Sequence, residues 1–118
     1  MNKPKILAIG CSNPDNSFSQ DEVIEKLGYK DNKFARRIFP YMGVNQRYMF
    51  LDRDAREKED SNQRHERYKQ GSLTIGKKSI ESCLQDYSGS ASDLDYIATT
   101  SCTGYLCPGL SPRLMKEL

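Results

Sequence analysis

Two short apolar runs near opposite ends of the chain place the strongest constraint on its fold. Residues 5–10 read KILAIG, and residues 94–101 read LDYIATTS. Both are apolar at their centres and are followed by turn-forming residues, which is typical of buried strands. Helical patterns lie between the two runs. This alternation predicts an α/β fold in which layered elements are joined by short crossovers.

Three shorter elements are expected between residues 17 and 51. Ser19 and Glu22 have the spacing of a capping box, which predicts a helix that ends at Gly28 in a left-handed turn. A second short helix is predicted over Lys33–Tyr41, ending near its proline because proline restricts the residue before it. Residues 44–51, VNQRYMFL, suit an extended segment or strand.

A long amphipathic helix is predicted over Ser61–Tyr87, because apolar residues recur there at helical spacing. Gly71 and Gly76 interrupt the pattern. Either they let another element approach closely, or they mark a break in the helix. After a loop over residues 102–109, Ser111 and Pro112 suit the N-cap and first position of a last helix.

Charge and hydropathy exclude several classes of protein. The 118 residues carry a net charge of +2 without a concentrated basic block, so a nucleic-acid-binding surface is not expected. Both signs alternate over residues 52–67, which indicates a solvated helix face or loop. No apolar run is long enough for a membrane span or a signal peptide. We therefore expect a cytoplasmic chain with reduced cysteines.

The cysteine and histidine pattern does not predict a metal site. The four cysteines include no CxxC pair, and the single histidine, His65, lies far from them in the sequence. His65 is expected at the surface of the long helix. Cys11 ends the first predicted strand and Cys83 falls on the apolar helix face, so both are expected to be core thiols.

Three segments together resemble type III polyketide synthases, the chalcone synthase-like members of the thiolase superfamily. They are KILAIGCSNPDNSFSQDEV, GVNQRYMFLD and DLDYIATTSCTGYLCPGLSPRLMKEL. The third is the most specific, because a strand, a glycine loop, a Pro-Gly pair and a helix must follow in order. Ketoacyl-ACP synthases of the third type share part of the pattern. The resemblance implies that residues 1–118 form the truncated N-terminal segment of a thiolase-like layered α/β/α domain.

The family condenses acyl-CoA with malonyl-CoA by decarboxylation and uses no metal or other cofactor. Its members need a cysteine nucleophile with a histidine and an asparagine that stabilise the enolate and the oxyanion. By the family's order, all three fall beyond Leu118, and His65 does not match the catalytic histidine. No catalytic residue is therefore assigned, and the isolated chain is expected to be inactive.

The resemblance does assign binding residues. Residues Cys102, Thr103, Gly104 and Cys107 match positions that line the acyl pocket, and Cys107 matches one that reaches across the family's dimer. The alternative for the two cysteines is a small buried thiol that fills space. Lys33 and Arg37, and less strongly Arg36, match cations that bind the phosphates of coenzyme A. For these cations the alternative is a solvated helix face.

Three functional hypotheses follow. The first is an N-terminal fragment of a condensing enzyme that binds acyl-CoA thioesters. The second is one subunit of a split enzyme, in which a complementary C-terminal polypeptide supplies the nucleophile, histidine and asparagine. The third is a non-catalytic interaction module that forms a defined oligomer and does not bind coenzyme A. Self-association is expected because the family is dimeric and because apolar surface is left exposed.

Overall fold

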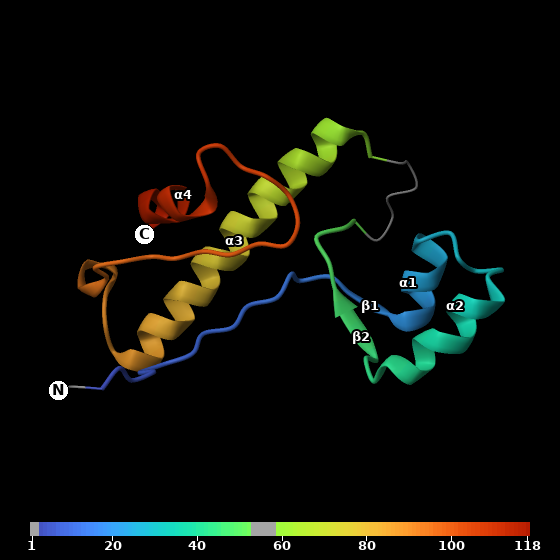
Figure 1. Ribbon diagram of the computed structural model, residues 1–118, viewed down its shortest axis with the longest axis horizontal. Coiled ribbons are helices and arrows are strands. Elements are labelled where there is room, and N and C mark those ends of the chain that lie inside the picture. The colour runs from blue at the N-terminus through green and yellow to red at the C-terminus, as the bar shows by residue number, and fades with distance from the viewer. Residues whose placement is uncertain (1–2, 53–58) are drawn as a thin grey trace. The chain divides into compact units, whose positions relative to one another are not determined.

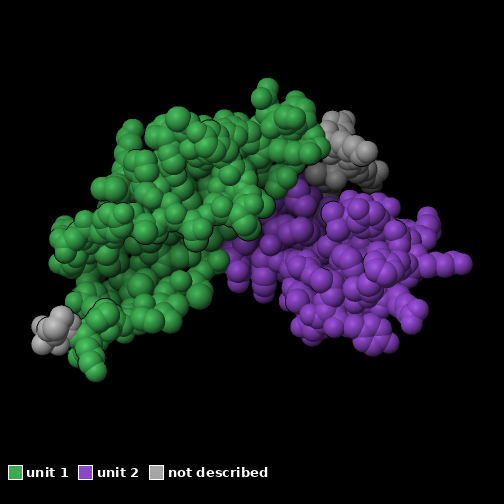
Figure 2. Space-filling view, in the orientation of Figure 1, with its two compact units in different colours: residues 1–12, 57–118 green, residues 13–56 purple. Residues whose placement is uncertain are grey.

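The computed structural model describes residues 3–52 and 59–118 and divides the chain into two compact units (Figure 1). Unit 1 comprises residues 1–12 and 57–118, and unit 2 comprises residues 13–56 (Figure 2). Unit 2 contains β1 (Ser17–Ser19), α1 (Gln20–Lys26), α2 (Lys33–Ile38), a 3₁₀ turn (Phe39–Met42) and β2 (Gln46–Tyr48). Unit 1 contains α3 (Ser61–Tyr87), a 3₁₀ turn (Ala91–Asp93) and α4 (Leu110–Glu117).

Unit 2 is built around a two-stranded antiparallel sheet and one buried aromatic ring. Strands β1 and β2 pair with Phe18 opposite Arg47. The Phe18 side chain is only 1% exposed, and Val23, Ile24 and Ala35 are the other buried apolar residues in the described part of the unit. The predicted extended segment over residues 44–51 is therefore confirmed in part, as the three-residue strand β2.

The capping box of α1 is confirmed. Glu22 donates its backbone N–H to Ser19 Oγ at 3.3 Å, and its carboxylate accepts from the Ser19 N–H at 2.7 Å. Gly28 follows the helix with φ 74°, the left-handed conformation that glycine adopts readily. These outcomes depend only on neighbours in sequence, so the local pattern was sufficient to predict them.

The second helix is shorter than predicted. Helix α2 ends at Ile38, and Pro40 lies in the following 3₁₀ turn, which closes at Gly43 with φ 67°. Proline lacks a backbone N–H, but it is tolerated in the first turn of a helix because N–H groups there have no helical acceptor. At the other end, Asn32 Oδ1 accepts from two backbone N–H groups, at 3.0 Å each.

Helix α3 is continuous over Ser61–Tyr87, so its two glycines do not break it. At Gly76 an added Cβ would lie 3.0 Å from a methyl carbon of Leu114, on α4. Gly71 is buried. The close-approach reading of Gly76 is therefore confirmed. The helix starts with a capping box in which Asp60 and Gln63 exchange two hydrogen bonds of 2.8 Å.

The N-terminal segment also approaches α3 at a glycine. A Cβ added to Gly10 would overlap the carbonyl oxygen of Ser79 and approach Cys83. Cys83 is half-buried, in keeping with its predicted place on the apolar face of the helix, whereas Cys11 is exposed. The expectation that Cys11 is a core thiol is therefore wrong: Gly10 makes the close approach to α3, and the Cys11 side chain is exposed.

The predicted strands over residues 5–10 and 94–101 are not formed. Ile6 is 83% exposed and Tyr96 is 85% exposed. A strand exists only through lateral hydrogen bonds, and neither segment makes a backbone ladder with other described residues. Apolar pattern and length are properties of the segment alone, but a ladder needs a second segment. The layered α/β/α arrangement thus stays a prediction for a larger fold.

Helix α4 begins earlier than the sequence suggested. Its N-cap is Gly109, so Ser111 and Pro112 lie within the first turn. The predicted N-cap role of Ser111 is wrong because its hydroxyl is paired elsewhere, at 2.7 Å from the hydroxyl of Thr99. Leu114 is 2% exposed and packs against α3 at Gly76.

The charged segment over residues 52–67 is only partly described, since residues 53–58 lie outside the described residues. Its last part begins α3 and is mostly exposed, as predicted. Arg67 donates to both carboxylate oxygens of Glu59, at 2.7 and 2.6 Å. This bidentate hydrogen bonding lowers the pKa of Glu59 below its ordinary value of 4.5, although partial burial acts in the opposite direction.

We predict that Leu114 carries much of the packing between α3 and α4. Leu114→Ala should lower the free energy of unfolding of unit 1 by about 2–5 kcal/mol, because it removes a buried side chain and leaves a cavity. Met115→Ala is the matched control, since Met115 is 63% exposed, and should stay within about 0.5 kcal/mol. Urea unfolding followed by helical circular dichroism measures both. Equal effects would contradict this packing.

We also predict a pH dependence at the start of α3. The folded pKa of Glu59 is lowered, so its ion pair stabilises the folded chain above the unfolded pKa, and this contribution is lost as pH falls through the folded pKa. Glu59→Gln should therefore be less stable than the parent at neutral pH and equal to it in acid. Unfolding curves across pH test this. A stability difference that persists in acid would show that the pair is not responsible.

Candidate functional site

The loop of residues 101–109 is held at its start by one side chain of α3. Tyr68 donates its hydroxyl hydrogen to Ser101 Oγ at 2.8 Å. The Ser101 hydroxyl in turn donates to the Thr103 carbonyl oxygen at 2.6 Å and accepts from the Thr103 N–H at 3.4 Å. Gly104 has φ 74°, and a Cβ added there would overlap the Tyr68 ring. The loop therefore lies directly against this ring.

The end of the same loop is held by α4. Arg113 donates through Nε to the Pro108 carbonyl oxygen at 3.0 Å and through Nη2 to the Cys107 carbonyl oxygen at 3.4 Å. The peptide bond between Cys107 and Pro108 is cis. Between the two ends, Leu106 is buried and anchors the loop. Both ends of the loop are thus fixed to helices of unit 1.

The four predicted pocket residues lie on this loop and face solvent. Cys102, Thr103, Gly104 and Cys107 are all exposed. The alternative reading of the two cysteines as buried, space-filling thiols is therefore wrong. Residues 102–104 lie at the end of the loop that contacts Tyr68. Cys107 lies at the other end, beside the contact with α4.

An apolar groove of about 420 Å³ lies next to α3 and α4. One wall is the inner face of α3, and the other is the extended segment of residues 94–100. The groove contains the half-buried Cys83 together with Ile80, Leu84, Tyr96, Ile97, Leu110 and Leu114. It is therefore lined by the same segment that was predicted to be a buried strand.

The predicted coenzyme A cations lie in unit 2. Lys33 and Arg37 are both in α2, four residues apart, so they occupy one face of the helix, and both are exposed. Arg37 lines a shallow hollow of about 360 Å³ together with Ile38, Tyr41 and Met42. Arg36 points from a different helical position and does not line the hollow. Arg37 thus shares a hollow with the exposed Tyr41 ring, and Lys33 lies one turn away along α2.

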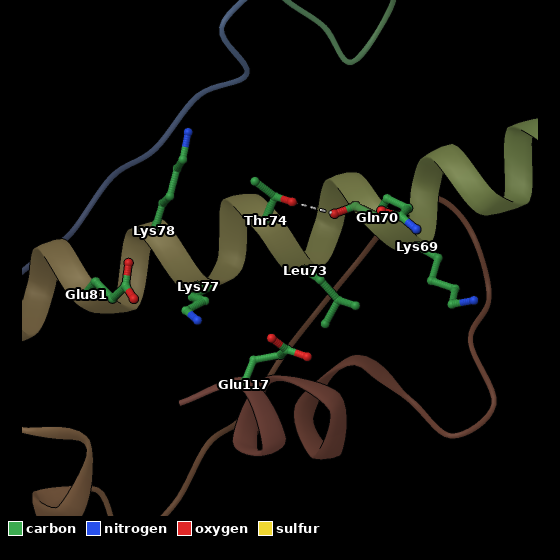
Figure 3. A pocket seen from close by; sticks show the side chains of 8 residues that line it. All are labelled: Lys69, Gln70, Leu73, Thr74, Lys77, Lys78, Glu81 and Glu117. Atoms are coloured by element: carbon green, nitrogen blue, oxygen red, sulfur yellow. Dashed lines mark hydrogen bonds between the residues drawn. The ribbon is translucent and has the colours of Figure 1, made fainter.

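A second hollow, of about 520 Å³, lies beside α3 and the end of α4 (Figure 3). Charges of both signs line it, and Glu117 of α4 points toward α3 (Figure 3). Lys69 is already paired with Glu66 at 3.1 Å. A mixed surface of this kind favours neither an anionic nor an apolar ligand. Its lining residues are Lys69, Gln70, Leu73, Thr74, Lys77, Lys78, Glu81 and Glu117.

Within residues 3–52 and 59–118, no group of three or more His, Cys, Asp or Glu side chains is placed to hold a metal ion. His65 is exposed on α3, as predicted from the charged sequence around it. None of the helices in the same ranges is long and apolar enough to cross a membrane.

Tyr68 and Arg113 were not predicted from the sequence as functional residues. Tyr68 falls among the apolar positions of the long helix, so its spacing indicated only a core residue. Arg113 follows a proline in an ordinary helical pattern. Their contacts with the loop span 33 and 5 to 6 residues of sequence, respectively. The contact between Tyr68 and Ser101 could not be predicted from neighbouring residues, because the only indication in the local sequence was the tyrosine hydroxyl.

The chain matches no protein-family model. It is similar along nearly its whole length to three curated proteins that are each named 3,5-dihydroxyphenylacetyl-CoA synthase. The relative from Streptomyces toyocaensis is 31% identical over 98% of this chain and 30% of its own length. Those from Amycolatopsis balhimycina and Amycolatopsis orientalis are 27% and 25% identical, each over 97% of this chain and 32% of its own. The chain thus spans about a third of these relatives.

Proposed function

We propose that this chain is the N-terminal part of a type III polyketide synthase, which condenses acyl-CoA with malonyl-CoA. The observation that carries the proposal is the similarity along 97–98% of the chain to three relatives with one printed name. The order of the sequence segments supports it, since the first strand-like run, the Arg-Tyr-Met segment and the glycine loop follow as they do in that family.

The catalytic groups are proposed to come from polypeptide outside these 118 residues. Condensation needs a cysteine thiolate to carry the acyl group and polar groups to stabilise the enolate. Among the described residues, no histidine is hydrogen-bonded to the exposed Cys102 or Cys107, and the Arg113 guanidinium beside Cys107 bonds its carbonyl oxygen. A thiol without a base to take its proton is a weak nucleophile at neutral pH. On its own, this chain is therefore proposed to bind but not to condense.

The loop of residues 101–109 is proposed to form one wall of the acyl pocket. Its residues 102–104 are small, weakly polar and held in one conformation by Tyr68, which suits a wall that must admit an acyl chain. Cys107 is fixed through its carbonyl by Arg113, so its thiol projects from the other end of the wall. The name of the relatives supports an aromatic acyl-CoA as the product class.

The exposed cations of α2 are proposed to bind the phosphates of coenzyme A. Arg37 offers a planar, bidentate donor set for a phosphate, and Lys33 adds a second positive charge one helical turn away. Tyr41 presents an exposed ring beside Arg37 in the same hollow. A nucleotide has both phosphates and a flat base, so this combination of cation and ring suits it.

A complementary polypeptide, or self-association, is proposed to complete the fold. Ile6, Leu7 and Ile9 are exposed in one extended segment, and Tyr96 is exposed in the other. Apolar segments with unpaired backbone favour pairing with further strands. This observation favours a split or longer condensing enzyme, including a relative of the third-type ketoacyl-ACP synthases, over a self-sufficient interaction module.

We predict that the purified chain gains no acyl group from acetyl-CoA or malonyl-CoA. Intact mass before and after incubation measures this, and peptide mapping covers all four cysteines. A polypeptide that follows this region in a synthase of the same family, added in trans, should restore acylation on its own cysteine. A stable acyl adduct on Cys102 or Cys107 would instead show that the nucleophile lies in this chain and would overturn the proposal.

We predict that coenzyme A binding depends on one face of α2. Lys33→Ala and Arg37→Ala should each weaken binding of free coenzyme A roughly threefold to tenfold, as expected for the loss of one charge-assisted contact. Arg36→Ala, on another face of the same helix, is the matched control. Calorimetric titrations at low and moderate salt measure all three. Undetectable binding by the parent chain, or equal loss in the control, would rule out this site.

A further inference from the structure

The side chain of Tyr68 contacts the glycine loop at two separate points. Its hydroxyl donates to Ser101 Oγ at 2.8 Å. Its ring lies where a Cβ at Gly104 would be, so the ring is packed on the backbone of that residue. Cys102 and Thr103 lie between these two points. We propose that Tyr68 is a positioning residue, which sets the conformation of the loop that carries Cys102 and Thr103.

The hydrogen bonds use the full bonding capacity of the Ser101 hydroxyl. A serine hydroxyl has one donor and two acceptor sites. Here the donor is used on the Thr103 carbonyl at 2.6 Å, and the acceptor sites are used by Tyr68 and by the Thr103 N–H. If the Tyr68 hydroxyl is removed, Ser101 keeps only its local bonds. The hydrogen bond between the turn and helix α3 is then lost, and only the ring contact at Gly104 remains.

The second contact explains why the loop has a glycine at position 104. Its φ of 74° disfavours any residue with a Cβ, and the Tyr68 ring occupies the space that a Cβ would need. The ring and the hydroxyl of Tyr68 therefore act together. The ring limits how closely the loop backbone approaches α3, and the hydroxyl fixes the orientation of the Ser101 side chain. Because Tyr68 is in the first half of a 27-residue helix, the loop is fixed to a rigid element.

The consequence for the pocket rests on the proposed function. If residues 102–104 form a wall of an acyl site, Tyr68 determines the shape of that wall without touching the acyl group. Exposed side chains such as Cys102 and Thr103 would otherwise sample many positions. A fixed wall reduces the entropy lost when a ligand binds. Tyr68 is therefore assigned to pocket geometry and not to the chemical step.

Tyr68→Phe tests the proposal because it keeps the ring and removes only the hydroxyl. Amide hydrogen exchange of the intact chain, followed by NMR, should become about threefold to tenfold faster at Thr103 and Gly104. Exchange in the middle of α3 should stay unchanged. Tyr96→Phe is the matched control, since Tyr96 is 85% exposed, and should change neither region. Unchanged exchange at Thr103 and Gly104, or an equal rise along α3, would overturn the positioning role.

Single variants of Ser101 test the positioning role of Tyr68 without changing any residue of α3. Ser101→Ala should accelerate exchange at Thr103 and Gly104 to the level of Tyr68→Phe or beyond, and adding Tyr68→Phe to it should have no further effect. Ser101→Thr keeps the hydroxyl and should restore the parent rate. Additive effects in the double variant would overturn the proposal. These measurements need no acyl-CoA, so the proposed function can fail in the acylation assay while this result stands.

Discussion

Close approach to the surface of α3 is the interaction on which the rest of unit 1 depends. Three segments reach the helix at positions where a side chain is missing or very small. Gly10 lies against the helix backbone, Leu114 packs over Gly76, and Tyr68 meets the loop at Gly104. Each contact needs a glycine on one side and a helix side chain or backbone on the other. Unit 1 is therefore arranged by where its glycines fall along the chain.

Each of the two units, taken by itself, holds candidate binding residues. Unit 1 holds the exposed loop and a 420 Å³ apolar groove, and unit 2 holds two cations on one helix face. Both places are suited to binding, since they offer apolar surface and positive charge. Under the proposed function, these surfaces would contribute recognition while other polypeptide contributes the chemistry, in keeping with relatives about three times as long.

Sequence reasoning succeeded where structure is decided by near neighbours. The capping box at Ser19, the left-handed turn at Gly28 and the length of α3 follow from local hydrogen bonds and helical spacing. It failed for residues 5–10 and 94–101, because a strand is defined by a partner that the segment itself does not reveal. The candidate pocket residues were predicted from family resemblance, whereas the role proposed for Tyr68 could not be, since it depends on a contact 33 residues away.

The two extended apolar segments also bear on how such a chain is made in a cell. Each is short, carries at most one charge between residues 6 and 9 or 94 and 101, and leaves its backbone open to pairing. Synthesis proceeds at roughly 5–20 residues per second, so residues 5–10 are made several seconds or more before residues 94–101. Until each segment finds a partner strand, it resembles the client sites of chaperones. The concentration of unpaired chain thus becomes a factor in the yield of folded protein.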